Sequence, residues 1–197
     1  MLTFVAAVFF LIITPGPGVL STAGVGAAYG YRAGLYYVGG LCIGTNLVAL
    51  AVVTGLAALI FSVPGARPVL AIASAAYLAY LAAKIALSGS KIAFIAAERP
   101  PGVMGGLMLQ FINPKAYAVN TTFFSGFAFF PDSLVTETIL KFLIINAIWL
   151  PLHILWLWAG VSLRRLNLGP VVQRRINIAM AASMLIVVAL AALAPRS

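Results

Sequence analysis

The sequence predicts an all-α integral membrane protein, with six transmembrane helices arranged as two inverted three-helix repeats in a single domain, residues 1–197. Hydrophobic residues make up 63% of the chain and charged residues 8%, with a mean hydropathy of +1.12, whereas soluble domains carry about a quarter charged residues. Six apolar segments are each long enough to cross about 30 Å of hydrocarbon as a helix. Two of them contain a proline-centred break, at Pro15 and Pro114, about a hundred residues apart.

The six apolar segments divide into two groups of three. They are residues 2–27, 34–61, 67–87, 103–130, 134–160 and 172–194. Their hydrophobicity is continuous rather than confined to one stripe, which is typical of spanning helices. Residues of about 88–102 form the one polar linker. Repeat 1 is therefore expected to cover about 1–90 and repeat 2 about 103–197.

The first segment is interrupted by Thr14-Pro15-Gly16-Pro17-Gly18. A proline inside a helix removes an N–H and clashes with the preceding turn, at a cost of about 3 kcal/mol or more. In lipid, the freed carbonyls are tolerated only where they face protein or a water-filled cavity. The break therefore predicts a hinge and a set of backbone dipoles at membrane depth, and a purely structural kink is the alternative. The start of the chain lacks the basic region and cleavage site of a signal peptide, so we expect a retained span.

The second segment contains Asn46, which has a counterpart in the second repeat. Asn46 follows Pro15 by 31 residues, and Asn146 follows Pro114 by 32 residues. Because asparagine is costly against lipid, both should face the interior of the bundle; ordinary interhelical hydrogen bonding is the alternative to a functional role. The only cysteine, Cys42, is expected to be a small packing residue. Glycines at small-xxx-small spacing allow helices to approach closely. They are Gly26, Gly30, Gly34, Gly40 and Gly44.

The fourth segment carries the most informative single residue, Lys115, within Asn113-Pro114-Lys115-Ala116. It lies about twelve residues into the segment, where burying a lysine costs about 2.5–3.5 kcal/mol on insertion scales. No carboxylate is expected at the same depth, so Lys115 is suited to an anionic group of a substrate. It could instead satisfy carbonyls freed by the Pro15 break, and the two roles are compatible.

The fifth segment begins with Asp132, Ser133 and Glu137, which we interpret as capping groups of a helix N-terminus. Lys141 is expected to extend its amine towards the membrane surface. His153 is the only histidine. Since a lone histidine cannot form a metal site, a packed and hydrogen-bonded role is expected for it.

The net charge of +9 comes from basic residues in the short gaps between apolar segments. The first, third and fifth gaps carry most of them, which places these gaps in the cytoplasm and both termini on the extracytoplasmic side. Because each repeat has three spans, the second must enter the membrane inverted. No aromatic and basic surface stretch supports nucleic-acid binding.

The chain resembles the LysE/RhtB-type amino-acid exporters over essentially its whole length. The resemblance rests on Thr14 to Gly18, on the glycine-rich region from Gly24 to Gly44, and on Asn113 to Ala116. It implies a multi-pass transporter of the bacterial inner membrane that exports amino acids or similar small metabolites, driven by the proton motive force. Related exporters often have an aspartate where this chain has Asn46, which makes a carboxylate-based proton route doubtful here.

A site for a small zwitterionic substrate is therefore expected where the two breaks meet. Its candidate residues are Thr14, Pro15, Gly16, Pro17, Asn46, Asn113, Pro114, Lys115 and Asn146. No cofactor or metal is expected, and a homodimer is left open. The alternatives are a cation or other small-metabolite exporter of the same superfamily and a non-transporting membrane assembly protein. An enzyme is disfavoured because no base, nucleophile and acid cluster together, and a redox carrier is disfavoured because there is one cysteine.

Overall fold

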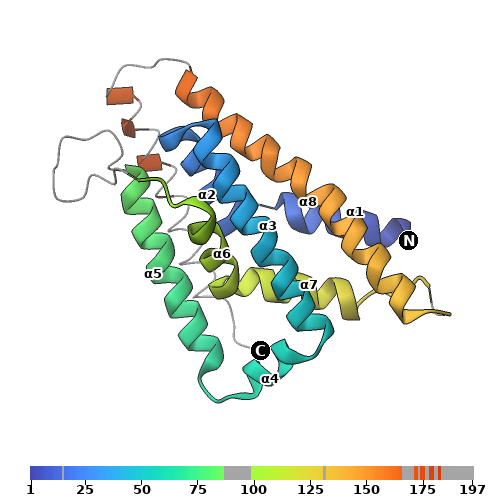
Figure 1. Ribbon diagram of the computed structural model, residues 1–197. Coiled ribbons are helices and arrows are strands. Elements are labelled where there is room, and N and C mark those ends of the chain that lie inside the picture. Colours follow the sequence, from blue (N-terminus) through green and yellow to red (C-terminus); the bar gives the residue numbers. More distant parts are fainter. Residues whose placement is uncertain are drawn as a thin grey trace.

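The computed structural model describes residues 1–14, 16–86, 99–130 and 132–165, together with residues 171, 172, 174, 175, 178, 179 and 182. Within these residues the chain forms helices and no strand, which confirms the all-α class (Figure 1). The helices are α1 (Leu2–Ile13), α2 (Pro17–Tyr29), α3 (Tyr31–Val53), α4 (Leu56–Ser62), α5 (Ala66–Ala86), α6 (Gly102–Ile112), α7 (Pro114–Ser125) and α8 (Leu134–Arg165). Most of the expected linker, residues 88–98, lies outside the described residues, as does Pro15. Of the expected sixth span, 172–194, the structure describes only separate residues.

The apolar helices agree in part with the expected spans. Helix α3 and the Leu134–Leu163 part of α8 are each long and apolar enough to cross a membrane. Helices α1 and α2, which meet at a bend of 50°, pass the same test as a pair and make a third span if the pair is one broken span instead of a re-entrant loop. The second break separates α6 from α7 at Asn113. Both proline breaks are thus true interruptions of helices.

The expected span 34–61 is not one helix, because it is interrupted between α3 and α4. Gly55 has a φ of +76°, in the left-handed region that favours glycine and ends a helix. The Thr54 hydroxyl donates back to the carbonyl of Leu50 at 2.8 Å, which completes the last turn of α3. Two residues, Thr54 and Gly55, separate α3 from α4, and the hydrophobicity of the segment does not reveal this turn.

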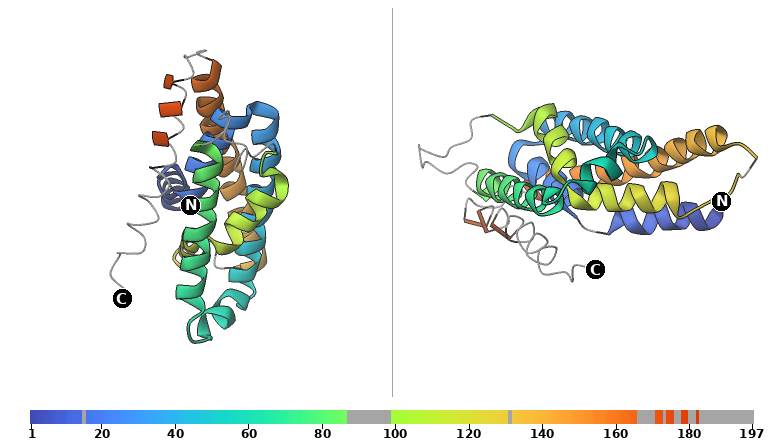
Figure 2. Two further views of the ribbon diagram at one scale, coloured as in Figure 1. Left: turned by 90° about the vertical axis from the view of Figure 1, so that its left-hand side faces the viewer. Right: turned by 90° about the horizontal axis from the view of Figure 1, so that it is seen from below.

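Glycines form the closest helix contacts, which lie between α3 and α6 and between α2 and α8 (Figures 1 and 2). A Cβ atom placed on Gly40 of α3 would lie 1.9 Å from the carbonyl oxygen of Val103. A Cβ on Gly160 of α8 would lie 2.1 Å from the carbonyl oxygen of Ala23. The expectation of close approach is confirmed for Gly26, Gly34, Gly40 and Gly44. Gly30 differs, because its φ of 84° turns the chain between α2 and α3.

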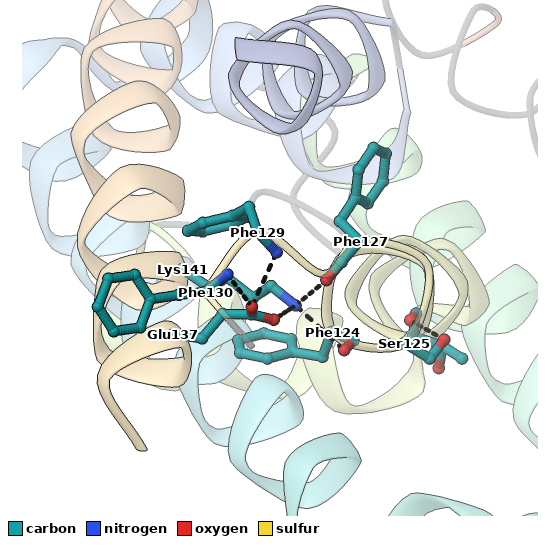
Figure 3. Close-up of polar contacts among 8 residues, drawn as sticks. Phe124, Ser125, Phe127, Phe129, Phe130, Glu137 and Lys141 are labelled. Carbon is teal, nitrogen blue, oxygen red and sulfur yellow. Dashed lines mark hydrogen bonds and ion pairs between the residues drawn. The ribbon is translucent and has the colours of Figure 1, made fainter. Parts of the chain in front are cut away.

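A buried ion pair fixes the loop between α7 and α8 (Figure 3). Lys141 lies 2.8 Å from Glu137 and also donates to the carbonyls of Phe124 and Phe127. The second oxygen of Glu137 accepts the N–H groups of Phe129 and Phe130, at 2.9 and 2.7 Å.

The expectation that Lys141 reaches the membrane surface is wrong, because its side chain is only 2% exposed. The loop carbonyls and Glu137 satisfy the ammonium inside the protein. Capping is confirmed for Ser133, whose hydroxyl accepts the N–H of Thr136 at 3.3 Å. The carboxylate of Glu137 binds the preceding loop instead of the start of its own helix.

Candidate functional site

A cavity lies where the two broken helix pairs meet α3 and α8. The space between its walls is about 510 Å³, a volume that includes the open solvent at its mouth. Its polar lining consists of Thr14, Thr45, Gln110, Asn113, Lys115, Asn120 and His153. Its apolar lining includes Leu11, Ile12, Val19, Val119, Phe123, Ile145 and Trp149. The cavity therefore combines one cationic group and several neutral polar groups with a large apolar wall.

The first break supplies a free carbonyl to this cavity. Helix α1 ends at Ile13, and α2 begins with Pro17 after an extended Gly16. A carbonyl at the end of a helix has no intrahelical partner, and the extended Gly16 takes the chain out of the helical path before the N–H of Gly18, four residues on, could pair with the carbonyl of Thr14. The carbonyl of Thr14 is therefore available to a partner from elsewhere in the chain.

The second break is shaped by Asn113. Its side-chain oxygen accepts the backbone N–H of Lys115 at 3.1 Å, so it caps α7, and Pro114 occupies the first position of that helix. The amide nitrogen of Asn113 donates to the side-chain oxygen of Gln110 at 3.2 Å. Asparagine as N-cap and proline at the first helical position are both favoured for a helix start. The local sequence thus accounts for a new helix that starts inside an apolar segment.

Lys115 joins the two breaks. Its ammonium donates to the carbonyl of Thr14 at 2.6 Å, across 101 positions of sequence. The approach requires Gly16, because a Cβ there would lie 2.9 Å from Cδ and 3.0 Å from Nζ of Lys115. The alternative in which Lys115 satisfies a carbonyl freed by the Pro15 break is confirmed. One hydrogen bond leaves the ammonium with further donors, and no carboxylate within the described part of the chain pairs with it.

His153 lines the same cavity from α8. Its ring is 3% exposed and stacks on Trp149, with centroids 3.5 Å apart and an interplanar angle of 16°. Its Nδ1 lies 2.9 Å from the carbonyl oxygen of Trp149. The packed, hydrogen-bonded role expected for His153 is confirmed, but its position in the cavity was missed. The signal was the spacing of Ile145, Trp149 and His153, which places all three on one face of a helix.

Three further polar residues of the cavity were also missed. Gln110, Asn120 and Thr45 are 4%, 4% and 8% exposed. Asn120 follows Asn113 by two helical turns and shares its face. Each is a neutral polar residue in an apolar segment, and the sequence does not show whether such a residue is buried in the protein or lies at a membrane surface. The structure shows that all three are buried.

Asn46 and Asn146 form a reciprocal pair between α3 and α8. The amide nitrogen of each donates to the side-chain oxygen of the other, at 2.9 and 2.8 Å. The expectation that both face the interior of the bundle is confirmed by this pair. Neither residue lines the cavity.

The other expected site residues divide by position. Thr14, Gly16, Asn113 and Lys115 line the cavity. Pro17 and Pro114 begin the helices that border it, whereas Pro15 lies outside the described residues.

Comparison with known proteins supports a transport role. The model of the LysE type translocator family matches residues 9–195 of the chain. The chain is 29% identical over 148 residues to the leucine efflux protein of Enterobacter sp. (strain 638), covering 73% of this chain and 69% of that protein. No solved structure matches the chain.

Proposed function

Because the chain belongs to the LysE type translocator family, and is accordingly a membrane transporter and not an enzyme, we propose that it exports an amino acid with an apolar side chain. The one observation that carries this proposal is the cavity in which Lys115 faces an apolar wall. Export is proposed to run through the bacterial inner membrane and to be driven by the proton motive force.

The substrate carboxylate is proposed to bind at Lys115. Among the described residues the ammonium has one hydrogen-bond partner, the carbonyl of Thr14, which carries no charge. A carboxylate would add the negative charge that this site lacks, together with a second charge-assisted hydrogen bond. The N-terminus of α7, which begins at Pro114, favours negative charge at the same position.

The substrate side chain is proposed to lie against the apolar wall. Phe123 and Trp149 supply its largest surfaces, and both are buried in the protein. Removing apolar surface from water stabilises the complex by about 25 cal/mol per Å². The name of the similar leucine efflux protein supports a substrate of this kind.

Alternating access is proposed to come from two inverted repeats that move against each other. In this proposal α1 and α2 form span 1, α6 and α7 form span 4, and α3 and α8 are spans 2 and 5. Span 1 packs on span 5 through α2, and span 4 packs on span 2 through α6. At the level of whole spans, a two-fold relation exchanges these two contacts and exchanges Asn46 with Asn146, which supports the proposal. The larger contact is made after the break in span 1, by α2, and before the break in span 4, by α6. Residues 172–194 would supply the sixth span, with both termini on the extracytoplasmic side.

Counterflow of labelled leucine into leucine-loaded proteoliposomes tests the function. Wild-type protein should exchange leucine, and Lys115→Met should lose most of the exchange because the carboxylate loses its partner. Arg32→Met is a suitable control, since Arg32 is exposed and does not line the cavity. Undiminished exchange by a folded Lys115→Met variant would contradict the role of Lys115. No exchange of leucine or of any other apolar amino acid by wild-type protein would contradict the proposed substrate class.

A further inference from the structure

His153 presents an unshared lone pair to the cavity. Its Nδ1 lies 2.9 Å from the carbonyl oxygen of Trp149, and because a carbonyl can only accept, Nδ1 carries the proton of the neutral ring. The other nitrogen, Nε2, is then the acceptor. Among the described residues, no donor is hydrogen-bonded to Nε2, although the ring is 3% exposed and lines the cavity. An acceptor of a residue that lines a cavity, with no hydrogen-bond partner among the described residues, is open to a donor that comes from outside the protein.

The two glycines of the first break are placed opposite the two basic side chains. Gly16 makes room for Lys115, and Gly18 lies against His153, whose Nε2 would be in van der Waals contact, at 3.4 Å, with a Cβ on Gly18. Both side chains therefore approach the same bend of the chain, one from α7 and one from α8. This arrangement places a hydrogen-bond donor with positive charge and a neutral acceptor on one side of the cavity.

Among the described residues that line the cavity, His153 and Lys115 are the two with titratable side chains. The linings from α1, α2, α3 and α6 contribute neutral groups, of which Thr14, Thr45 and Gln110 are polar. Besides His153 itself, α8 contributes apolar Ile145 and Trp149 to the lining. Its charged residues lie near its two ends: Glu137 and Lys141 are paired with each other near the start, and Arg164 and Arg165 are its last two residues. Histidine is the side chain that changes charge most readily near neutral pH.

We propose that His153 carries the transported proton, and that the proton and the α-ammonium group of the substrate compete for its Nε2. This proposal rests on the proposed export of an amino acid. A zwitterion with its carboxylate at Lys115 would place its ammonium group within the same bend, where neutral Nε2 can accept one of its N–H bonds. A protonated imidazolium has no lone pair at Nε2 and repels the ammonium, so one site holds either the proton or the substrate.

Competition at one atom converts a proton gradient into export. With the cavity open to the cytoplasm, substrate binds, the Nε2–H bond breaks and the proton enters the cytoplasm. With the cavity open to the opposite side, the substrate leaves and Nε2 takes a proton from that solution. Each cycle moves one proton inwards for each substrate molecule moved outwards, and His153 returns to its starting state.

The single histidine allows a direct measurement on wild-type protein. With ¹⁵N-labelled histidine, the nitrogen spectrum reports this imidazole alone and identifies a pH at which it is partly protonated. Addition of leucine at that pH, in weakly buffered solution, should shift the spectrum to the neutral ring and release up to one proton per bound leucine. A ring that stays neutral at every pH at which the protein is folded, or leucine binding without proton release, would overturn the proposal.

The matching variant is His153→Gln, which keeps a polar side chain but cannot carry the proton. Leucine counterflow at equal pH should fall, because glutamine replaces a ligand of the substrate ammonium, and the counterflow that remains should no longer be stimulated by a pH gradient. Trp158→Phe, on the same helix but 57% exposed, should keep both activities. Gradient stimulation in a folded His153→Gln variant would overturn the role of His153 while leaving the export function intact. Absence of counterflow in wild-type protein would instead contradict the export function, and this proposal with it.

Discussion

At the scale of single residues, the site depends on glycine positions as much as on charged groups. Lys115 reaches the carbonyl of Thr14 only because Gly16 has no side chain at the point of contact. Lys115 and Asn113 could be predicted from sequence because charged and amide groups are rare inside apolar segments. His153 and Gln110 could not be assigned to the cavity, since a segment that is apolar all round does not reveal which of its faces lines the site.

Replacement of Gly16 by alanine tests this dependence. The added Cβ would lie within 3.0 Å of two atoms of the Lys115 side chain, which must move. We expect Gly16→Ala to weaken leucine binding and counterflow while the protein stays folded. Gly39→Ala is the matched control, because a Cβ at Gly39 has no heavy atom within 4 Å. Equal counterflow by the two variants would show that Lys115 need not occupy its observed position.

At the scale of helices, close packing depends on glycines whose spacing was visible in the sequence. The spacing indicated close approach, but it could not identify α6 as the partner of Gly40. It also could not show that Gly30 forms the turn between α2 and α3. The break between α3 and α4 was missed because Gly55 lies within an apolar segment whose hydropathy continues across it. Both proline breaks were predicted, since proline excludes the helical hydrogen bond through its own covalent structure.

The neighbouring glycines Gly39 and Gly40 provide a test of the α3–α6 contact. A Cβ on Gly40 would overlap the backbone of Val103, whereas a Cβ on Gly39 meets open space. Overpacking a tight contact typically costs about 1–3 kcal/mol, so Gly40→Ala should lower the free energy of unfolding by an amount of that order. Gly39→Ala should leave it equal or higher, since alanine favours the helix. Denaturation in mixed micelles would compare them, and equal stability would contradict a close contact between α3 and α6.

At the scale of the whole molecule, the two broken helix pairs meet at one cavity. Their meeting was predicted from the matching positions of Pro15 and Pro114, and Lys115 bonded to Thr14 provides the contact between them. The reciprocal bonds of Asn46 and Asn146 connect the second spans of the two proposed repeats. The sequence could indicate this pairing because both asparagines follow their breaks at nearly the same distance, although it could not distinguish a contact outside the cavity from a substrate ligand.

Protection of a cavity residue by substrate tests the location of the site most directly. Val119 lines the cavity from α7, and Leu143 is 62% exposed on α8. Each would be replaced by cysteine in a Cys42→Ser background and labelled with a maleimide, with and without leucine. We predict that leucine slows the labelling of Val119→Cys and leaves that of Leu143→Cys unchanged. Unchanged labelling of Val119→Cys, in protein that still exchanges leucine, would contradict the claim that the substrate binds where the two breaks meet.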